Sequence, residues 1–338
     1  MSLHYINDMK KYNTLVSVCI CTYNQDAYLE RAIRSVADQR MMPLEIIVSD
    51  DCSTDSTPDI LERLSDEIQC LKVVRQHENV GIARNVDSCL RLAVGEYVVR
   101  LDSDDFLNAN YIEKLVEAMS RYPRAGYAHS AVREVDEHGE LLKERKLFRE
   151  TAYQTDVAAL RAAVKGYRVA ANILMFRRNA LEKVGYLTGR PNFGEDYHLT
   201  AAISAAGYGN IYVAQTLAFY RVWTDPGKLR SRRKQTEIEG LTMVFEEVIE
   251  PAYQTRSWAS GKLSKKRTAL ACHHADCLSW DFFNVDEKRS LMTALYRLSP
   301  ATRVKVFSWL YLEGYGGILT QYYRLKADLK SIAKSFIT

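Results

Sequence analysis

The chain has 338 residues, 47% of them hydrophobic and 26% charged, with a formal net charge of +4 at pH 7. Such a chain can bury a large core, and one domain with a helical extension suits this length better than one compact unit. No stretch approaches the ~20 continuous apolar residues that cross a bilayer, and residues 1–13 lack the apolar segment of a signal peptide, so we expect a cytoplasmic protein. The odd number of cysteines, seven, favours buried reduced thiols.

Short apolar strands alternate with amphipathic helices over the first hundred residues. We expect strands at 16–22, 45–49 and 72–74, and helices at about 27–37 and 58–64. The first two strands are apolar runs rich in β-branched residues, which is typical of strands buried on both faces. This order predicts a parallel α/β sheet.

Polar side chains follow these strands at the edge where an open α/β sheet binds its ligands. They are Thr22, Tyr23 and Asn24 after the first strand, and Asp50 and Asp51 after the second. Residues 21–29 contain no glycine and no GxxxxGK[ST] loop is present, so the sequence excludes the Rossmann dinucleotide-binding turn and the P-loop. Metal and side chains would have to hold a diphosphate instead.

A cluster of carboxylates ends the strand that we expect at 96–101, where the sequence reads EYVVRLDSDD. Asp102 and Asp104 are spaced i, i+2 and so point to the same side. Hard cations such as Mg²⁺ or Mn²⁺ bind one or two carboxylates together with phosphate oxygens, so this pair predicts a metal–diphosphate site. A second interpretation is a solvated acidic turn that caps a helix beginning near Asn110.

A resemblance adds weight to the first interpretation. The chain contains, in order, VSVCICTYNQDAYLERAIRSV, LEIIVSDDCSTDST, HENVGIARNVDSCLRLAVGEYVVRLDSDDFL, ANILMFRRNALEKVGYL, GEDYHLTAAISAAG and FYRVW. This series spans about residues 16 to 225 and resembles the inverting nucleotide-sugar glycosyltransferases of family 2. The resemblance implies a GT-A fold, an α/β fold with a Rossmann-like, mixed but mainly parallel sheet flanked by helices, as a catalytic domain over residues 1–225. Residues 226–338 would form a basic, mainly helical C-terminal extension for acceptor, membrane-surface or oligomer contacts.

The resemblance implies a nucleotide site at the ends of the first two strands. Tyr23 would stack on the nucleobase, while Thr22 and Asn24 would shape the turn around it. Asp51 would accept a hydrogen bond from the base, and a uracil N–H suits such an acceptor, which favours a UDP or dTDP donor. The other interpretation of the pair Asp50–Asp51 is a turn that caps the next helix.

Donor and metal contacts also follow from the resemblance. Arg84 comes after the family's NxG element, here Asn79–Gly81, and would reach the ribose or the phosphates; an ordinary exposed helix residue is the alternative. Asp104 would ligate a divalent metal, Mn²⁺ or Mg²⁺, and Asp102 would contact the ribose, the metal or its bound water. The ion would stabilise the charge that grows on the departing diphosphate.

The resemblance places the catalytic base at Asp196, which opens a helix after the loop at 189–194. Asp196 would take the proton of the acceptor hydroxyl as that oxygen attacks the anomeric carbon opposite the leaving diphosphate, which inverts this centre. A helix N-terminus and a nearby cation favour the ionised form, so we expect Asp196 to be charged at pH 7 and to work by position rather than by a raised pKa. Glu195 would support Asp196 or bind the acceptor or donor sugar.

The segment FYRVW departs from the family's YRxH element, because Trp223 stands where many relatives have His. If that His is a metal ligand, the ion would rely here on Asp104, the diphosphate and water, or on Asp225. Trp223 would otherwise form an apolar wall over the sugar. The basic run at 228–234 is either a mobile lid whose cations meet the diphosphate or a solvated face.

The extension is the basic part of the chain. Residues 221–338 carry 20 basic and 12 acidic side chains, against 26 and 30 in residues 1–220. The segment 318–336 has an apolar stripe at helical spacing with lysines and arginines around it, which predicts an amphipathic helix that packs on the protein itself or lies on an anionic membrane surface. Residues 272–277, CHHADC, lie in a helical stretch where adjacent side chains diverge, so we expect no metal site there.

Together these patterns predict a metal-dependent inverting glycosyltransferase. It would move a sugar from a nucleotide diphosphate, with UDP preferred, to a hydroxyl of a glycan or lipid-linked acceptor in cell-surface polysaccharide assembly, in the cytoplasm or on the inner face of the membrane. We expect no nucleic-acid partner and leave a homo-oligomer open. Two alternatives share the fold: a nucleotidyltransferase, which the absence of a glycine-rich basic N-terminal loop opposes, and a non-catalytic sugar-nucleotide-binding or assembly protein.

Overall fold

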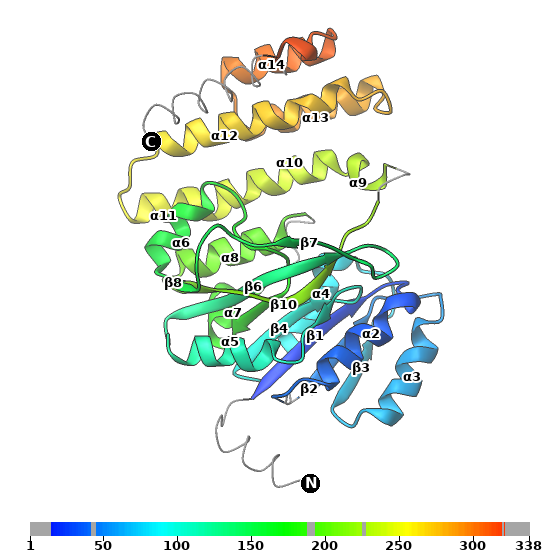
Figure 1. Ribbon diagram of the computed structural model, residues 1–338. Helices are drawn as coiled ribbons and strands as arrows, with labels where there is room; N and C mark the ends of the chain where they lie inside the picture. Colours follow the sequence, from blue (N-terminus) through cyan, green and yellow to red (C-terminus); the bar gives the residue numbers. More distant parts are fainter. Residues whose placement is uncertain (1–14, 42–44, 188–192, 225–227, 320, 322–338) are drawn as a thin grey trace. The chain divides into compact units, whose positions relative to one another are not determined.

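Two compact units make up the chain, Met1–Thr224 and Asp225–Thr338 (Figure 1). The computed structural model describes residues 15–41, 45–187, 193–224, 228–319 and 321. Asp225 and most of the segments at 189–194 and 318–336 lie outside the described residues, so the predictions made for them stay predictions.

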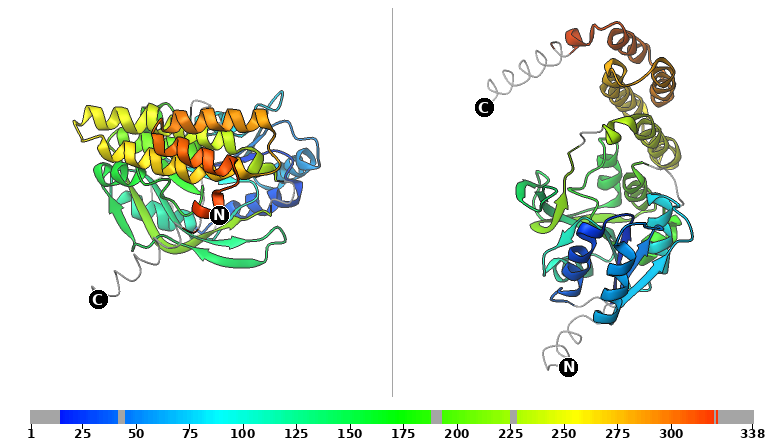
Figure 2. Two further views of the ribbon diagram at one scale, coloured as in Figure 1. Left: turned by 90° about the horizontal axis from the view of Figure 1, so that it is seen from above. Right: turned by 90° about the vertical axis from the view of Figure 1, so that its right-hand side faces the viewer.

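The first unit is a ten-stranded sheet with helices on both faces (Figures 1 and 2). Its strands are β1 (Val16–Thr22), β2 (Glu45–Asp50), β3 (Leu71–Arg75), β4 (Tyr97–Asp102), β5 (Phe106–Leu107), β6 (Ala125–Val135), β7 (Leu141–Arg145), β8 (Ala152–Gln154), β9 (Leu174–Arg177) and β10 (Gly209–Arg221). Its helices are α2 (Asp26–Ala37), α3 (Thr57–Glu67), α4 (Ile82–Leu92), α5 (Tyr111–Ser120), α6 (Asp156–Ala163), α7 (Arg178–Val184) and α8 (Glu195–Ala205). The strands and helices expected in the first hundred residues are confirmed, with ends that differ by at most a few residues.

The strand order explains why the predicted site residues meet. The sheet runs β3-β2-β1-β4-β9-β6-β10-β5, with β7 paired to β6 and β8 to β10. β1 is parallel to β2 and β4, whereas β9 is antiparallel to β4 and β6, so the sheet is mixed as expected for a GT-A fold. In this register Thr22 lies beside Asp50 and Cys21 beside Asp102. The carboxyl ends of β2, β1 and β4 therefore form one continuous edge.

Alternate residues of β1 enter two separate cores. Val18 and Ile20 pack with α2, α3 and α5 on one face, whereas Cys19 and Cys21 pack with α4, α7 and α8 on the other. Since helices cover both faces, the strand needs no solvent-facing side, which is why its sequence is mainly apolar and carries no charged residue. β3 differs because it is the edge strand, and only Leu71 in it is buried.

The second unit is helical. Its elements are α9 (Leu229–Arg232), α10 (Lys234–Met243), the π-helical turn η1 (Val244–Ile249), α11 (Glu250–Thr255), α12 (Gly261–His274), the 3₁₀ turn η2 (Ala275–Ser279), α13 (Val285–Leu298) and α14 (Thr302–Leu312). Cys272 and Cys277 are buried in the core of this unit. In the part of the chain that the structure describes, no helix is both long and apolar enough to cross a membrane.

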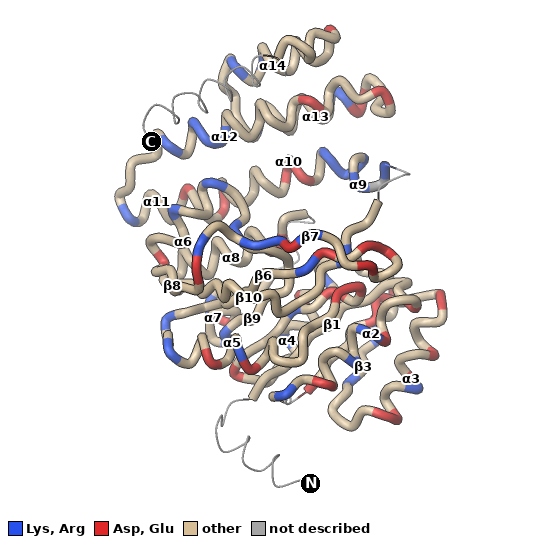
Figure 3. Tube along the Cα trace, in the orientation of Figure 1, with Lys and Arg blue, Asp and Glu red and all other residues tan. Residues whose placement is uncertain are grey.

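Lysine and arginine residues gather around α9 (Figure 3), and three of them contact acidic residues of the second unit. Lys228 lies 3.7 Å from Asp281, Arg232 lies 3.6 Å from Glu287, and Lys234 lies 2.8 Å from Glu237. Lys228 and Arg232 are also placed over the ring of Phe282.

Strand β8 packs so closely on the start of β10 that Gly209 has no room for a side chain. A Cβ at this position would lie 2.1 Å from the carbonyl oxygen of Gln154 and 2.5 Å from the ring of Tyr153. We expect Gly209→Ala to lower the free energy of unfolding by about 1–3 kcal/mol, because such overpacking forces the backbone apart. Chemical denaturation measures the change. Gly261→Ala, where a Cβ meets nothing within 4 Å, is the control and should leave stability unchanged or higher.

Candidate active site

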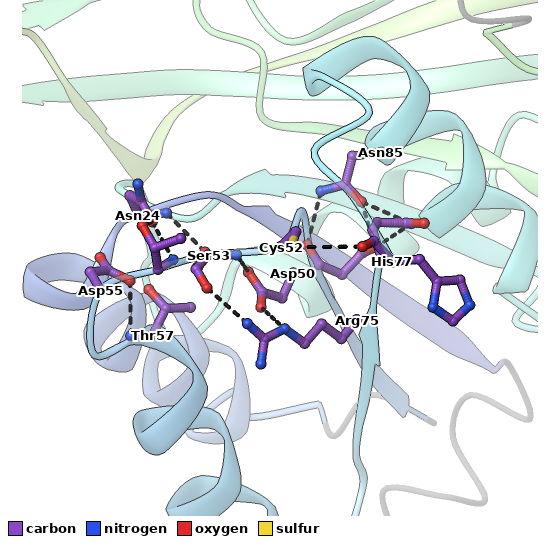
Figure 4. A network of polar contacts seen from close by, with 12 residues as sticks. Asn24, Asp50, Cys52, Ser53, Asp55, Thr57, Arg75, His77 and Asn85 are labelled. Carbon is purple, nitrogen blue, oxygen red and sulfur yellow. Dashed lines mark hydrogen bonds and ion pairs between the residues drawn. The ribbon is translucent and has the colours of Figure 1, made fainter.

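The turn after β1 is fixed to the loop after β2. The backbone N–H of Asn24 donates to Ser53 Oγ at 2.9 Å, and its side-chain Oδ1 accepts from the N–H of Thr54 at 2.8 Å (Figure 4). Asn24 has a φ of 51°, a left-handed conformation that asparagine tolerates better than most residues. Tyr23 is 45% exposed, and Thr22 is buried with no hydrogen-bond partner for its Oγ1. The turn therefore presents one aromatic ring to solvent on a fixed backbone.

Asp50 and Asp51 organise loops instead of capping a helix. Asp50 accepts from the N–H of Ser53 at 3.0 Å and lies 3.4 Å from Arg75 (Figure 4). Asp51 is buried, and its two oxygens accept the N–H groups of Val80 and Gly81 at 2.8 and 2.9 Å. The carboxylate beside the first turn of α3 is Asp55, which accepts from Thr57. Asp50 and Asp51 therefore do not cap α3, so the capping interpretation is wrong, and Asp51 joins two loops at the carboxyl end of β2.

Arg84 and its neighbour Asn85 point in different directions. Arg84 is exposed in the first turn of α4. Asn85 is buried: its Oδ1 accepts from Ser49 Oγ at 2.6 Å, and its Nδ2 donates to the carbonyl of Ser49 at 2.9 Å. Asn85 thus fastens α4 to β2. Among the described residues, Arg84 forms no hydrogen bond or ion pair with another predicted site residue.

The turn after β4 is held by the end of β10. The backbone N–H of Arg221 donates to Asp105 Oδ1 at 2.7 Å, and its Nε donates to the carbonyl of Asp104 at 3.0 Å. Burial raises the pKa of Asp104, and repulsion from Asp102 adds to the rise. Strand β5 separates this turn from α5, so the acidic residues do not cap that helix and the second interpretation of DSDD is wrong.

Trp223 contacts the predicted metal ligand. Its indole Nε1 donates to Asp104 Oδ2 at 2.7 Å, and its ring lies edge-on to Tyr28 with the centroids 5.2 Å apart. The guanidinium of Arg221 lies over the other ring of this pair, 4.3 Å from the centroid of Tyr28. Trp223 is thus a fixed hydrogen-bond donor to the acidic turn, a role that the sequence did not indicate.

One buried arginine joins the acidic turn to the start of α8. Arg100, on β4 and 3% exposed, forms a hydrogen-bonded ion pair with Asp196 and lies 3.2 Å from Asp102 and 3.5 Å from Glu195. Asp196 and Glu195 are the first residues of α8 and are 3% and 9% exposed. Sequence reasoning missed Arg100, although an arginine two residues before Asp102 in an apolar strand was a usable signal.

This cluster changes the expected charge of Asp196. Burial raises the pKa of Asp196 to about 8; the Arg100 guanidinium acts against the rise, and Glu195 and Asp102 add to it. A single guanidinium faces three carboxyl groups here, so negative charge is in excess where water solvates it poorly. The expectation that Asp196 works without a raised pKa is therefore wrong, because burial raises that pKa, while the contact with the Arg100 guanidinium favours the ionised form.

The sequence is similar to a known protein family and to individual glycosyltransferases. The model of the family described as "Glycosyl transferase family 2" matches residues 17–185. TuaG of Bacillus subtilis, named for teichuronic acid biosynthesis, is 40% identical over 111 residues, which are 33% of this chain and 44% of TuaG. A GalNAc(5)-diNAcBac-PP-undecaprenol beta-1,3-glucosyltransferase of Campylobacter jejuni is 36% identical over 115 residues, 34% of this chain and 36% of that enzyme. The matches thus span less than half of these relatives.

Solved structures share the fold over most of the chain. The crystal structure of Staphylococcus aureus TarS 1-349 superposes with a TM-score of 0.67 and 17% identity, covering 92% of this chain and 91% of that one. Its complex with UDP-GlcNAc gives a TM-score of 0.66 at the same identity, with 92% of each chain covered. The family match covers half of the sequence, and the motifs at the carboxyl ends of β1, β2 and β4 lie within it. This chain therefore belongs to glycosyl transferase family 2.

Proposed function

We propose that this glycosyltransferase moves a sugar from a UDP-sugar, with a divalent cation bound, to a hydroxyl of a glycan or lipid-linked acceptor in cell-surface polysaccharide assembly, inverting the anomeric centre. The observation that carries the proposal is the meeting of Asp102 and Asp196 on one guanidinium, because it brings the end of β4 and the start of α8 together. A leaving diphosphate and an attacking hydroxyl would need groups at these two places.

The donor end of the proposal rests on the turn after β1 and on Asp51. Tyr23 offers an exposed ring for the base, and Asn24 holds the backbone of that turn. Each oxygen of Asp51 accepts one backbone N–H and has a further lone pair, so Asp51 remains an acceptor for a base N–H. The complexes of TarS with UDP-GlcNAc and with UDP support a uridine donor by analogy of fold.

The acidic turn fits a divalent cation that would take most of its ligands from phosphate oxygens and water. Asp102 and Asp104 supply hard oxygen donors, and burial together with mutual repulsion raises the pKa of Asp104, a strain that a cation would relieve. No three His, Cys, Asp or Glu side chains converge on a metal position among the described residues. Asp104 and Asp102 would therefore hold the ion together with phosphate oxygens and water. When bound, the ion would stabilise negative charge on the departing diphosphate.

Asp196 would perform the proton transfer. The acceptor oxygen forms a bond to the anomeric carbon, the bond from that carbon to the diphosphate oxygen breaks, and the hydroxyl proton passes to the Asp196 carboxylate. A base with a raised pKa is stronger than an ordinary carboxylate and works best near its own pKa. Glu195, on the outer side of the same guanidinium, would shape the charge around Asp196.

Nucleotide binding is the first test. We expect UDP with Mn²⁺ to raise the melting temperature by several degrees, because a ligand at 100 times its Kd stabilises the folded state by about 2.7 kcal/mol. dTDP, GDP and CDP, each with and without Mn²⁺, are the competitors.

Asp104→Asn should remove the part of the shift that depends on Mn²⁺. Asp66→Asn, on the exposed face of α3, is the control and should keep it. A shift that is the same with and without Mn²⁺ would contradict the metal assignment.

Asp196→Asn tests the base. The amide keeps the shape of the side chain but takes up no proton, so we expect the turnover of the UDP-sugar to fall at least 1,000-fold, a loss of about 4 kcal/mol of transition-state stabilisation. The melting shift with UDP and Mn²⁺ should persist. Glu195→Gln is the matched control and should keep measurable turnover. Normal turnover in Asp196→Asn would refute the assignment of the base.

The pKa of Asp196 also predicts the dependence of the rate on pH. The carboxyl must be ionised to accept the proton, and burial raises its pKa to about 8 in the free protein. We therefore expect kcat/KM for the donor, which reports on the free enzyme, to rise with pH from 6 and to level off above about 8. A rate that is independent of pH over this range would show that Asp196 is ionised throughout.

A further inference from the structure

Arg100 occupies a position where an arginine is costly. It lies in the middle of β4, between strands β1 and β9, and its side chain is 3% exposed. Removing a guanidinium from water costs several kcal/mol unless partners with good geometry replace the lost hydration. The neighbouring strand offers only Cys19, paired with Arg100 in register, and the thiol of Cys21. The partners must therefore come from the end of β4 itself or from other elements.

The partners of Arg100 are all carboxylates of the proposed site. Its Nε and Nη2 donate to Asp102 Oδ1 at 3.3 and 3.2 Å, its Nη1 donates to Asp196 Oδ1, and Glu195 Oε1 lies 3.5 Å from Nη2. Nε and Nη2 thus bind the end of β4, and Nη1 binds Asp196 in the first turn of α8. Glu195 lies beside Nη2, the nitrogen that also donates to Asp102. A guanidinium has a fixed arrangement of donors, so it sets the distance and the angle between the carboxylates of Asp102 and Asp196.

Two other arginines of the same sheet, one buried and one largely buried, show what a structural arginine does here. Arg221 donates to the backbone carbonyls of Asp104 and Asp136. Arg177 donates to the carbonyls of Ala125 and Met119 at 3.1 and 3.0 Å, and its side chain is 11% exposed. Both side chains donate mainly to backbone carbonyls, and Arg177 Nη1 also donates to Glu96 Oε1 at 3.1 Å. No hydrogen bond described for Arg100 goes to a carbonyl.

We propose that Arg100 is a positioning residue that holds the carboxylate of Asp196 in line for the acceptor hydroxyl and ties it to Asp102 in the donor site. This inference rests on the proposed role of Asp196 as the base. Glu195 is the second carboxylate of α8 on the same fork, so the first turn of the helix is held at two points. If the acidic turn moved, the guanidinium of Arg100 would move Asp196 with it.

The test separates positioning from folding with three variants, assayed as UDP release from the UDP-sugar that stabilises the protein. Arg100→Met should lower kcat about 100-fold, the loss expected for a base displaced by about 1 Å, while KM for the donor stays within about threefold. Arg100→Lys should regain part of the lost melting temperature but not kcat, because an ammonium restores charge without the fork. Arg177→Met, at the other end of β4 opposite Tyr97, should lose stability and keep kcat.

The outcomes are distinct. If Arg100→Met does not fold, Arg100→Lys carries the test, and a wild-type kcat in that variant would overturn the inference because charge alone would then suffice. A normal kcat in folded Arg100→Met, with Asp196→Asn inactive, would overturn the role of Arg100 and leave the proposed base intact. Full activity in Asp196→Asn would remove the base assignment and this inference with it. A loss of kcat in Arg177→Met equal to that in Arg100→Met would also overturn the inference, since any buried arginine would then have the same effect.

Discussion

Strands buried on both faces confine most of their charged side chains to the strand ends, and the organisation of this site depends on that constraint. β1, β2 and β4 are covered by helices on both sides, so acidic residues lie at the ends of these strands, and those of the proposed site lie at the carboxyl ends. The parallel register sets those ends side by side, with Thr22 beside Asp50 and Cys21 beside Asp102. Arg100 is a buried charge inside β4, and it is balanced by carboxylates at the edge of the sheet.

The loops at this edge are fixed by contacts that differ in chemical kind. Asp51 accepts two backbone N–H groups from the loop before α4, and Asn24 connects the turn after β1 to the loop after β2. Arg221 holds the acidic turn through a backbone carbonyl and a carboxylate. Each loop is therefore anchored to an element that is distant in sequence, which allows a flexible segment to present a defined surface.

The sequence predicted the parts of this site that leave a local pattern. The strands show as apolar runs, the acidic turn as DSDD, and the start of α8 as a carboxylate pair before a helical stretch. Long-range partners leave no such pattern: Asp196 follows Arg100 by 96 residues, and Trp223 follows Asp104 by 119. The contacts of Asp51 were invisible for another reason, because its partners are backbone N–H groups that nearly every residue has. The pKa of Asp196 depends on burial and on three neighbours, so it required the fold.

Trp223 has a consequence for how a cation and a nucleotide would bind. An indole N–H can only donate, so this residue cannot ligate a metal, and in this structure it occupies one oxygen of Asp104. A cation at the acidic turn would then have few protein ligands and would depend on phosphate oxygens for the rest. Cation and nucleotide would in that case each strengthen the binding of the other, and the coupling would be the same in both directions. Such a site would bind its cation mainly when the donor diphosphate is present. The bound cation would then offset the repulsion between the carboxylates of the acidic turn.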